Sequence, residues 1–200
     1  MRMIESILKK VWAGAGIAVV AAGCLTASAP SQVASWTIEF QPAPAAASVA
    51  SAETTARGNA RIAQVSVRAP YDAREIAVLR SDGSMAFDPY NRFASMPAAL
   101  LRGALQDAFL SHGAFRTTVA SGSQLETDVA VEATVTRLAL DCREEGKRTA
   151  VVELTILLLR DRAVYASARG EGTADAADGN YTQAFSQAFS RAVASALSRL

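Results

Sequence analysis

Segments in which large apolar residues alternate with polar ones recur along the chain after residue 35. A period of two is typical of a strand with one buried face. It predicts strands at 36–40, 61–68, 75–80, 85–87, 115–119, 127–140, 149–159 and 163–173. Ser81–Ser84 contains an Asp-Gly pair, which tolerates positive φ, and this predicts a hairpin between two of the strands.

The alternation changes phase at two places, which predicts two irregular points in the strands. Ile62 is out of phase with Val65, and Val135 is out of phase with Leu138. A one-residue insertion moves the following side chains to the other face of a strand. We therefore expect a kink or bulge at the first point and a bulge or strong twist at the second.

Two segments carry apolar residues with spacings of three and four, which predicts amphipathic helices. The first covers 95–112, with Ser95 as its cap, Pro97 in its first turn and Gly113 as its stop. The second follows a capping residue, Asn180, and runs to the end of the sequence. The order strands, helix, strands, helix predicts a two-layer α+β domain, with a mostly antiparallel sheet and both helices packed on one face.

The first 23 residues have the layout of an export signal. Arg2, Lys9 and Lys10 precede an uncharged apolar run at 11–22. Such a run is too short for a spanning helix, which needs ~20 residues, but it fits a secretory signal peptide. Small residues then lead to Cys24.

The residues around Cys24 resemble the lipobox of bacterial lipoproteins. The resemblance implies that the Cys24 thiolate receives a diacylglyceryl group, that cleavage falls before it, and that the new amine is acylated. Ala21 is a departure, because that position usually holds Leu, Val or Ile. Leu25 replaces the Asp that usually retains such proteins at the inner membrane, which implies the outer membrane. A plain signal peptide with a chance cysteine and an N-terminal anchor helix are the alternatives.

These features divide the chain into a signal peptide at 1–23, a lipidated tether at 24–35 and a single domain at 36–200. Within the domain, 41–60 is rich in Ala, Pro and Ser and is predicted to be a loop or linker. A flexible linker of that length has a mean span of ~25 Å, enough to hold the domain away from lipid headgroups.

The charge of the chain excludes one class of partner. The formal charge is +1, from twenty basic and nineteen acidic residues. Without 1–23 the chain has seventeen basic and eighteen acidic residues, and no long block of either sign. Such a charge distribution does not recruit nucleic acid.

Few side chains could carry chemistry, and they form no recognisable constellation. His112, the single histidine, ends a predicted helix, where the helix dipole favours a cation. Glu144–Glu145 is predicted to be solvated charge in a turn, and Asp175 and Asp178 are predicted turn formers. Cys142 has no intramolecular partner if the first cysteine is lipidated, and is predicted to be a structural thiol. Without a zinc ligand set, a phosphate loop or a nucleophile elbow, we predict no catalytic, metal-binding or cofactor-binding residue.

The segment YDAREIAVLRSDGSMAFDPYNRFASMPAALLRGAL, at 71–105, resembles the ABC-type transport auxiliary lipoproteins, namely the paraquat-inducible type C component and its relatives. Its markers are a hairpin, Tyr90-Asn91, an aromatic-alanine pair and Pro97. Relatives often have Trp where this chain has Phe93. Two later segments, VTRLALDC and ADGNYTQAFSQAFSRAVASAL, are similar as well, so the resemblance covers roughly 36–200.

The resemblance implies an auxiliary subunit of an MCE-domain lipid transport system, which binds and anchors but is not an enzyme. It also implies a homo-oligomer docked on the MCE protein. Together with Cys24, it predicts an outer-membrane lipoprotein that faces the periplasm.

Two other classes of function stay open. A monomeric lipid-binding carrier needs an apolar cavity of several hundred Å³, and an envelope enzyme needs a pocket with converging polar groups.

The motif Asp88-Pro89-Tyr90-Asn91 is itself a turn sequence. Asp accepts hydrogen bonds from nearby amides, Pro fixes φ and Asn tolerates the left-handed conformation. Tyr90 and Phe93 are predicted to hold this turn on the sheet or on the following helix. Packing alone and a partner-binding surface are the two explanations that the motif leaves open.

Overall fold

Eight strands and two helices lie within the residues that the computed structural model describes, which are 32–42, 58–113 and 115–200. Val33–Leu200 is one compact unit. The predicted signal peptide, Cys24 and most of 41–60 lie outside the described residues. Neither described helix is long and apolar enough to cross a membrane.

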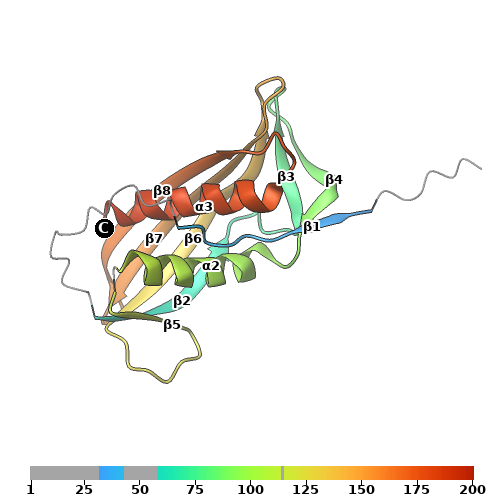
Figure 1. Cartoon of the computed structure of the whole chain (residues 1–200). Helices are drawn as coiled ribbons and strands as arrows, with labels where there is room; N and C mark the ends of the chain where they lie inside the picture. The colour runs from blue at the N-terminus through green and yellow to red at the C-terminus, as the bar shows by residue number, and fades with distance from the viewer. Residues whose placement is uncertain (1–31, 43–57, 114) are drawn as a thin grey trace, which may run out of the picture. The chain divides into compact units, whose positions relative to one another are not determined.

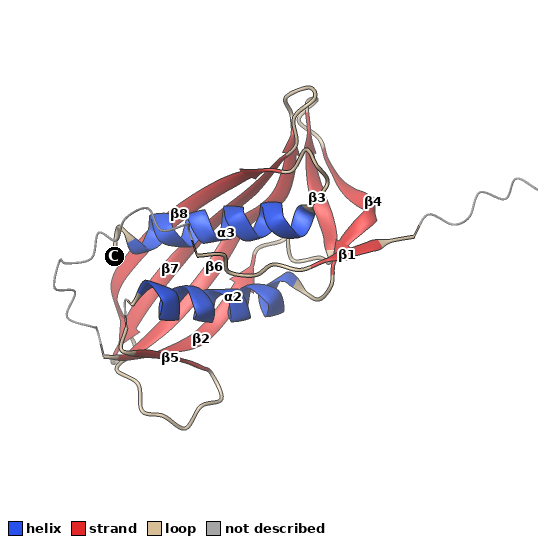
Figure 2. Ribbon diagram, in the orientation of Figure 1, coloured by secondary structure: helices blue, strands red, loops and turns tan. Residues whose placement is uncertain are grey.

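The strands form a single sheet, which Figure 2 shows behind the two helices. One path through it has the order β1-β4-β3-β6-β2-β5, and β7 and β8 extend the sheet from the other edge of β6. The strands are β1 (Ala34–Trp36), β2 (Asn59–Val67), β3 (Glu75–Arg80), β4 (Met85–Phe93), β5 (Thr117–Ala120), β6 (Val129–Cys142), β7 (Thr149–Arg160) and β8 (Ala163–Asp175).

β6 organises the sheet because it is long enough to have three neighbours. β7 pairs with it from Ala130 to Asp141, which leaves the other edge for β2 and β3. β2 pairs with the first half of β6 and β3 with its last four residues, both in the parallel direction. β2 and β3 therefore pair with successive parts of the same edge of β6, and the loop at 68–74 connects them.

The sheet is mixed, so the prediction of a mostly antiparallel sheet is wrong, although the α+β class is correct. The pairs joined by short turns, β3–β4, β6–β7 and β7–β8, are antiparallel as predicted. The pairs β1–β4, β2–β5, β2–β6 and β3–β6 are parallel. Alternation shows which side chains face the core, but it does not show the direction of a neighbour that lies far away in the sequence.

Both helices cover the same face of the sheet, as predicted (Figure 1). α2 (Pro97–His112) lies against β2 and β5, and α3 (Tyr181–Leu197) lies against β7 and β8. The core between the layers consists of apolar side chains from both helices and from the alternating strand positions that face them.

The helix ends agree with the sequence at three of five points, and α3 stops at Leu197 and not at the end of the sequence. Gly113 ends α2 with a φ of 67°, and Pro97 is in the first turn of that helix. Asn180 caps α3, because its side chain accepts a hydrogen bond from Gln183 N. Ser95 is not the cap of α2. Met96 holds that position and makes no side-chain capping hydrogen bond.

Both predicted irregular points are present as register shifts. One lies in the β2–β6 pairing between Ile62 and Gln64, and the other lies in the β6–β7 pairing between Val135 and Arg137. Apolar residues before and after each shift belong to the same core. Each shift therefore returns the following apolar side chains to the face that the helices cover.

Candidate functional site

The segment that follows β1 is held on α3 by a row of hydroxyl groups. Residues 37–41, called the strap here, run between α2 and α3 (Figure 1). Every second backbone N–H of the strap donates to a side-chain hydroxyl of α3. The three pairs are Thr37 N to Thr182 Oγ1 (3.2 Å), Glu39 N to Ser186 Oγ (3.0 Å) and Gln41 N to Ser190 Oγ (2.9 Å).

The spacing of this hydroxyl row follows from the geometry of the two backbones. Two residues of extended chain advance about 6.6 Å, and four residues of helix advance about 6 Å. Hydroxyls at every fourth position of α3 therefore match alternate amides of the strap over three contacts. Ser186 and Ser190 are buried, and Ser190 Oγ also donates to the carbonyl of Ser186 (2.8 Å). The row thus satisfies amides that would otherwise need a neighbouring strand.

The opposite side of the strap is apolar. Ile38 is buried in the core, and Phe40 packs against it. Trp36, at the end of β1, lies with its ring centroid 5.3 Å from that of Tyr181. The alternation predicted over 36–40 is present, but only its first residue belongs to a strand, because the neighbour of the strap is a helix.

β1 and the strap place the residues before 43 inside the folded unit. The compact unit begins at Val33 and therefore includes β1 and the strap. The described ends of the predicted linker, 41–42 and 58–60, belong to this same unit.

The motif at 88–91 forms a bulge inside β4: Asp88 accepts hydrogen bonds from nearby amides as predicted, but the strand continues through the motif and the chain does not reverse. The pairing of β4 with β3 continues on both sides of the motif, with a register shift between them. Asp88 Oδ1 accepts hydrogen bonds from Tyr90 N (2.9 Å) and Asn91 N (3.1 Å), which stabilises the bulge. Pro89 is tolerated there because a bulge does not need every ladder hydrogen bond. Asn91 does not adopt a positive φ.

Asn91 connects the bulge to the start of the folded chain. Its Nδ2 donates to Asp88 Oδ2 (2.9 Å), and its Oδ1 accepts from Trp36 Nε1 (2.8 Å). β1 pairs in parallel with Asn91–Phe93. The most recognisable motif of the sequence therefore holds β1, the strand that leads into the strap.

The two aromatic residues of the motif have different environments. Phe93 is buried, and its ring lies edge-on to Phe185 of α3, with 5.3 Å between the centroids. Its predicted packing role is confirmed. Tyr90 is 54% exposed, so it does not hold the motif on the sheet or on a helix. Tyr90 is instead an aromatic side chain presented to solvent.

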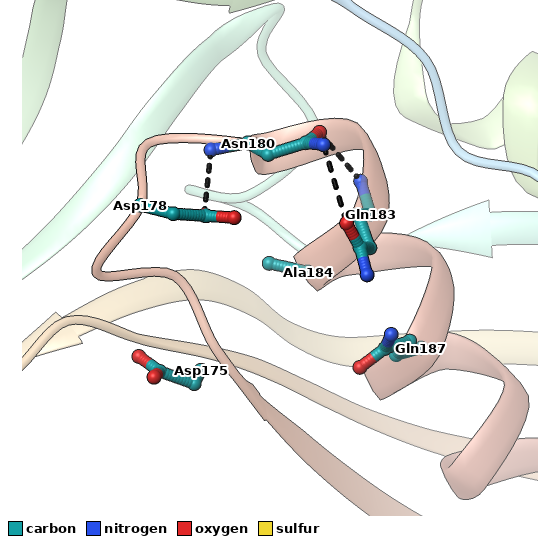
Figure 3. Close-up of a pocket in the computed structure, with 6 residues that line it drawn as sticks. All are labelled: Asp175, Asp178, Asn180, Gln183, Ala184 and Gln187. Atoms are coloured by element: carbon teal, nitrogen blue, oxygen red, sulfur yellow. Dashed lines mark hydrogen bonds between the residues drawn. The ribbon is translucent and has the colours of Figure 1, made fainter.

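A shallow polar pocket of about 240 Å³ lies at the start of α3 (Figure 3). It is lined by Asp175, Asp178, Asn180, Gln183, Ala184 and Gln187. Asp175 Oδ1 accepts from Ala177 N, and Asp178 Oδ1 accepts from Asn180 N, both at 2.9 Å. Both carboxylates therefore form local turns, as the sequence predicts.

A second pocket, of about 360 Å³, lies beside the β6–β7 turn, where Lys147, Asp175 and Arg191 are among its lining residues. The first pocket is polar, and the second mixes charged side chains with apolar surface, so neither is the apolar cavity that a lipid carrier requires. Within the part of the chain that the structure describes, no three His, Cys, Asp or Glu side chains are grouped so as to hold a metal ion.

A family model described as "ABC-type transport auxiliary lipoprotein component" matches residues 37–199, which include the strap, the β4 motif and α3. The chain belongs to this family. The family is one of transport auxiliary lipoproteins and not of known enzymes. The chain is thus a component that serves a transport system of the cell envelope.

Solved structures support the fold. The protein XCC0632 from Xanthomonas campestris has a TM-score of 0.61 at 20% identity, covering 84% of this chain and 93% of its own. An uncharacterised protein has a TM-score of 0.56 at 15% identity, covering 80% and 95%. The PelC dodecamer of Paraburkholderia phytofirmans reaches a TM-score of only 0.34 at 17% identity, covering 68% and 90%, which supports no argument here. Among curated proteins, none matches the chain.

The remaining candidate residues of this transport auxiliary protein have structural roles. His112 is in the last turn of α2. Glu144 pairs with Lys147 at 2.5 Å, and both side chains are mostly exposed, as expected for solvated charge. Cys142 is a free, half-buried thiol, and burial raises its pKa, which disfavours the reactive thiolate.

Proposed function

We propose that this chain is the outer-membrane-anchored auxiliary subunit of an MCE-type ABC transport system, which moves phospholipid or other hydrophobic molecules between membranes. The family match over residues 37–199 is the observation that carries the proposal. The protein binds and anchors within this assembly and does not turn over a substrate.

Cys24 supplies the anchor in this proposal. Acyl chains on its sulfur and on its amine partition into the membrane, each buried CH₂ contributing ~0.8 kcal/mol, so two or three chains hold the protein durably. Leu25 directs it to the outer membrane, because it stands where inner-membrane lipoproteins usually carry Asp. Removal of 1–23 leaves Cys24 at the N-terminus, with eight residues between it and Val33.

The folded domain supplies the contact with the MCE protein, as a homo-oligomer. Neither pocket described above is an apolar cavity, and apolar side chains of the two helices and the sheet form the core between the layers. This arrangement favours a docking component over a carrier that encloses a lipid.

Affinity purification of the C-terminally tagged full chain from detergent-solubilised envelope tests the proposal. We expect the MCE protein, with its permease and ATPase, to be recovered with the tagged chain. Cys24→Ser is the matched control, because it removes the lipidated thiol and should shift the protein out of the outer-membrane fraction. Recovery of the tagged chain without any MCE protein would contradict the proposed function.

A further inference from the structure

We propose that the β1–β4 edge of the sheet rests on the membrane that holds the lipid anchor. The contact surface is the anchor-side strip, which we define as Val33, Met85, Phe87 and Tyr90. This inference rests on the proposed function, because it requires the lipid at Cys24.

The strip consists of large apolar side chains that remain in solvent. The exposed fractions of Val33, Met85, Phe87 and Tyr90 are 46%, 38%, 44% and 54%. Phe87 pairs across the sheet with Ala77, and Met85 pairs with Leu79. Ile76, the neighbour of Ala77, belongs to the core under the helices. Because alternate residues face opposite sides of a sheet, Phe87 and Met85 lie on the face without helices.

One end of the strip lies where the N-terminal segment joins the domain. Val33 directly precedes β1, whose Ala34 pairs with Asn91, so Val33 and Tyr90 are neighbours in the extension of this pairing. β1 is the edge strand on this side of the sheet, and β4 is next to it. The chain that leads from Cys24 therefore meets the domain beside Tyr90.

The short tether keeps this edge close to the anchor. Nine residue steps separate Cys24 from Val33, and they span at most about 30 Å when fully extended and less on average. A folded unit of this size is about 40 Å across. The tether is on average shorter than the domain, so the edge that carries Val33 stays nearest the lipid surface.

The chemistry of the strip suits a lipid headgroup region. A Tyr ring has an apolar body and a polar hydroxyl, and such side chains concentrate at membrane–water interfaces. Charges of both signs lie beside the strip, because Arg92 pairs with Glu75 across the sheet and Asp88 lies between Phe87 and Tyr90. Apolar contact therefore dominates, and it acts on a surface that the anchor already holds nearby.

Tryptophan fluorescence in proteoliposomes tests this inference on the mature, lipidated chain. After cleavage before Cys24, Trp36 is the only tryptophan. Tyr90→Trp adds a second one within the strip. Tyr165→Trp adds it at a site of similar exposure, 43%, on β8, which is four strands away from β4 across the sheet. Each chain is placed in phosphatidylethanolamine–phosphatidylglycerol vesicles with and without dibrominated acyl chains.

We expect the bromolipid to quench about half of the added emission in Tyr90→Trp and almost none in Tyr165→Trp, after subtraction of the Trp36 signal of the unsubstituted chain. Equal quenching of both variants would show that the domain touches the membrane without preference for the strip. Quenching in neither variant would assign the strip to a second copy or to the MCE protein. Either result would overturn the inference. Mass spectrometry of the same samples reports the lipid separately. A lipidated chain without Tyr90→Trp quenching refutes only the membrane contact, whereas an unlipidated chain refutes the proposed function and this inference with it.

Discussion

The two helices cover the same face of one sheet, yet they are held there in different ways. α3 begins at a capping side chain, Asn180, packs directly on β8 and binds the strap through its hydroxyl row. α2 begins at Met96 without a side-chain cap, and Gly103 in its second turn faces open space. The comparison shows that α3 joins the N-terminal segment to the sheet, whereas α2 mainly completes the core.

The contact of α3 with β8 is the closest between the two layers. A Cβ built at Gly170 of β8 would overlap the backbone of α3 at Ala192. Arg191 of α3 and Arg199, which follows the end of α3, also donate to two backbone carbonyls of β8. Because β8 is an edge strand, these arginines occupy acceptors that an added strand would need.

The largest expected change in stability comes from alanine substitution at Gly170, which lies under α3, compared with the same substitution at Gly103 within α2. Gly170→Ala should lower the free energy of unfolding by about 3 kcal/mol, because the backbone of α3 must move away from the new methyl group. Gly103→Ala is the matched control and should raise it by about 0.5–1 kcal/mol, because Gly is unfavourable inside a helix. Urea unfolding followed by circular dichroism measures both. Similar values for the two variants would show that α3 is not more tightly constrained than α2.

An intermediate effect is expected for the hydroxyl row. Ser186→Ala should destabilise the domain by about 1–2 kcal/mol, because the amide of Glu39 loses its acceptor. Ser195→Ala makes the same substitution in α3 at a half-buried position outside the row, so both variants gain the same helix propensity. Hydrogen exchange at the Glu39 amide, together with urea unfolding, measures the difference. Unchanged exchange in Ser186→Ala would mean that the row does not hold the strap.

The smallest expected changes in stability come from substitutions at the N-caps of the two helices. Asn180→Ala should cost about 1 kcal/mol, because Gln183 N loses the capping oxygen. Met96→Asp supplies the cap that α2 lacks and should stabilise the domain by up to about 1 kcal/mol. Thermal unfolding of the two variants should move in opposite directions. A loss of stability in Met96→Asp would show that Met96 has a packing role that its exposure does not reveal.

Several local features could be predicted because their cause lies within a few residues. The phase changes near Ile62 and Val135 correspond to the observed register shifts. Asp175 and Asp178 form the turns that their short side chains favour. The motif at 88–91 was more difficult, because a bulge and a turn use the same residue types and differ only in whether pairing with the neighbouring strand continues.

The strap could not be predicted, although its two halves are visible in the sequence. Alternation over 36–40 indicates an extended segment with one apolar side. Hydroxyl residues at 182, 186 and 190 have a spacing of four, which places them on one side of a helix. Neither pattern predicts that the extended segment binds the hydroxyl row, because the bonded residues are 145 to 149 positions apart in the sequence.

By itself, the sequence determined which side chains face the core, where most of the turns and helix ends fall, and the family to which the chain belongs. These properties depend on residue spacing and on backbone preferences that act over a few residues. Only the tertiary structure decided the directions of β1, β2 and β3 relative to their neighbours, the place of the strap on α3 and the exposure of Tyr90. Those properties depend on which distant segments share hydrogen bonds and buried area, and that choice is made by the packing of the whole domain.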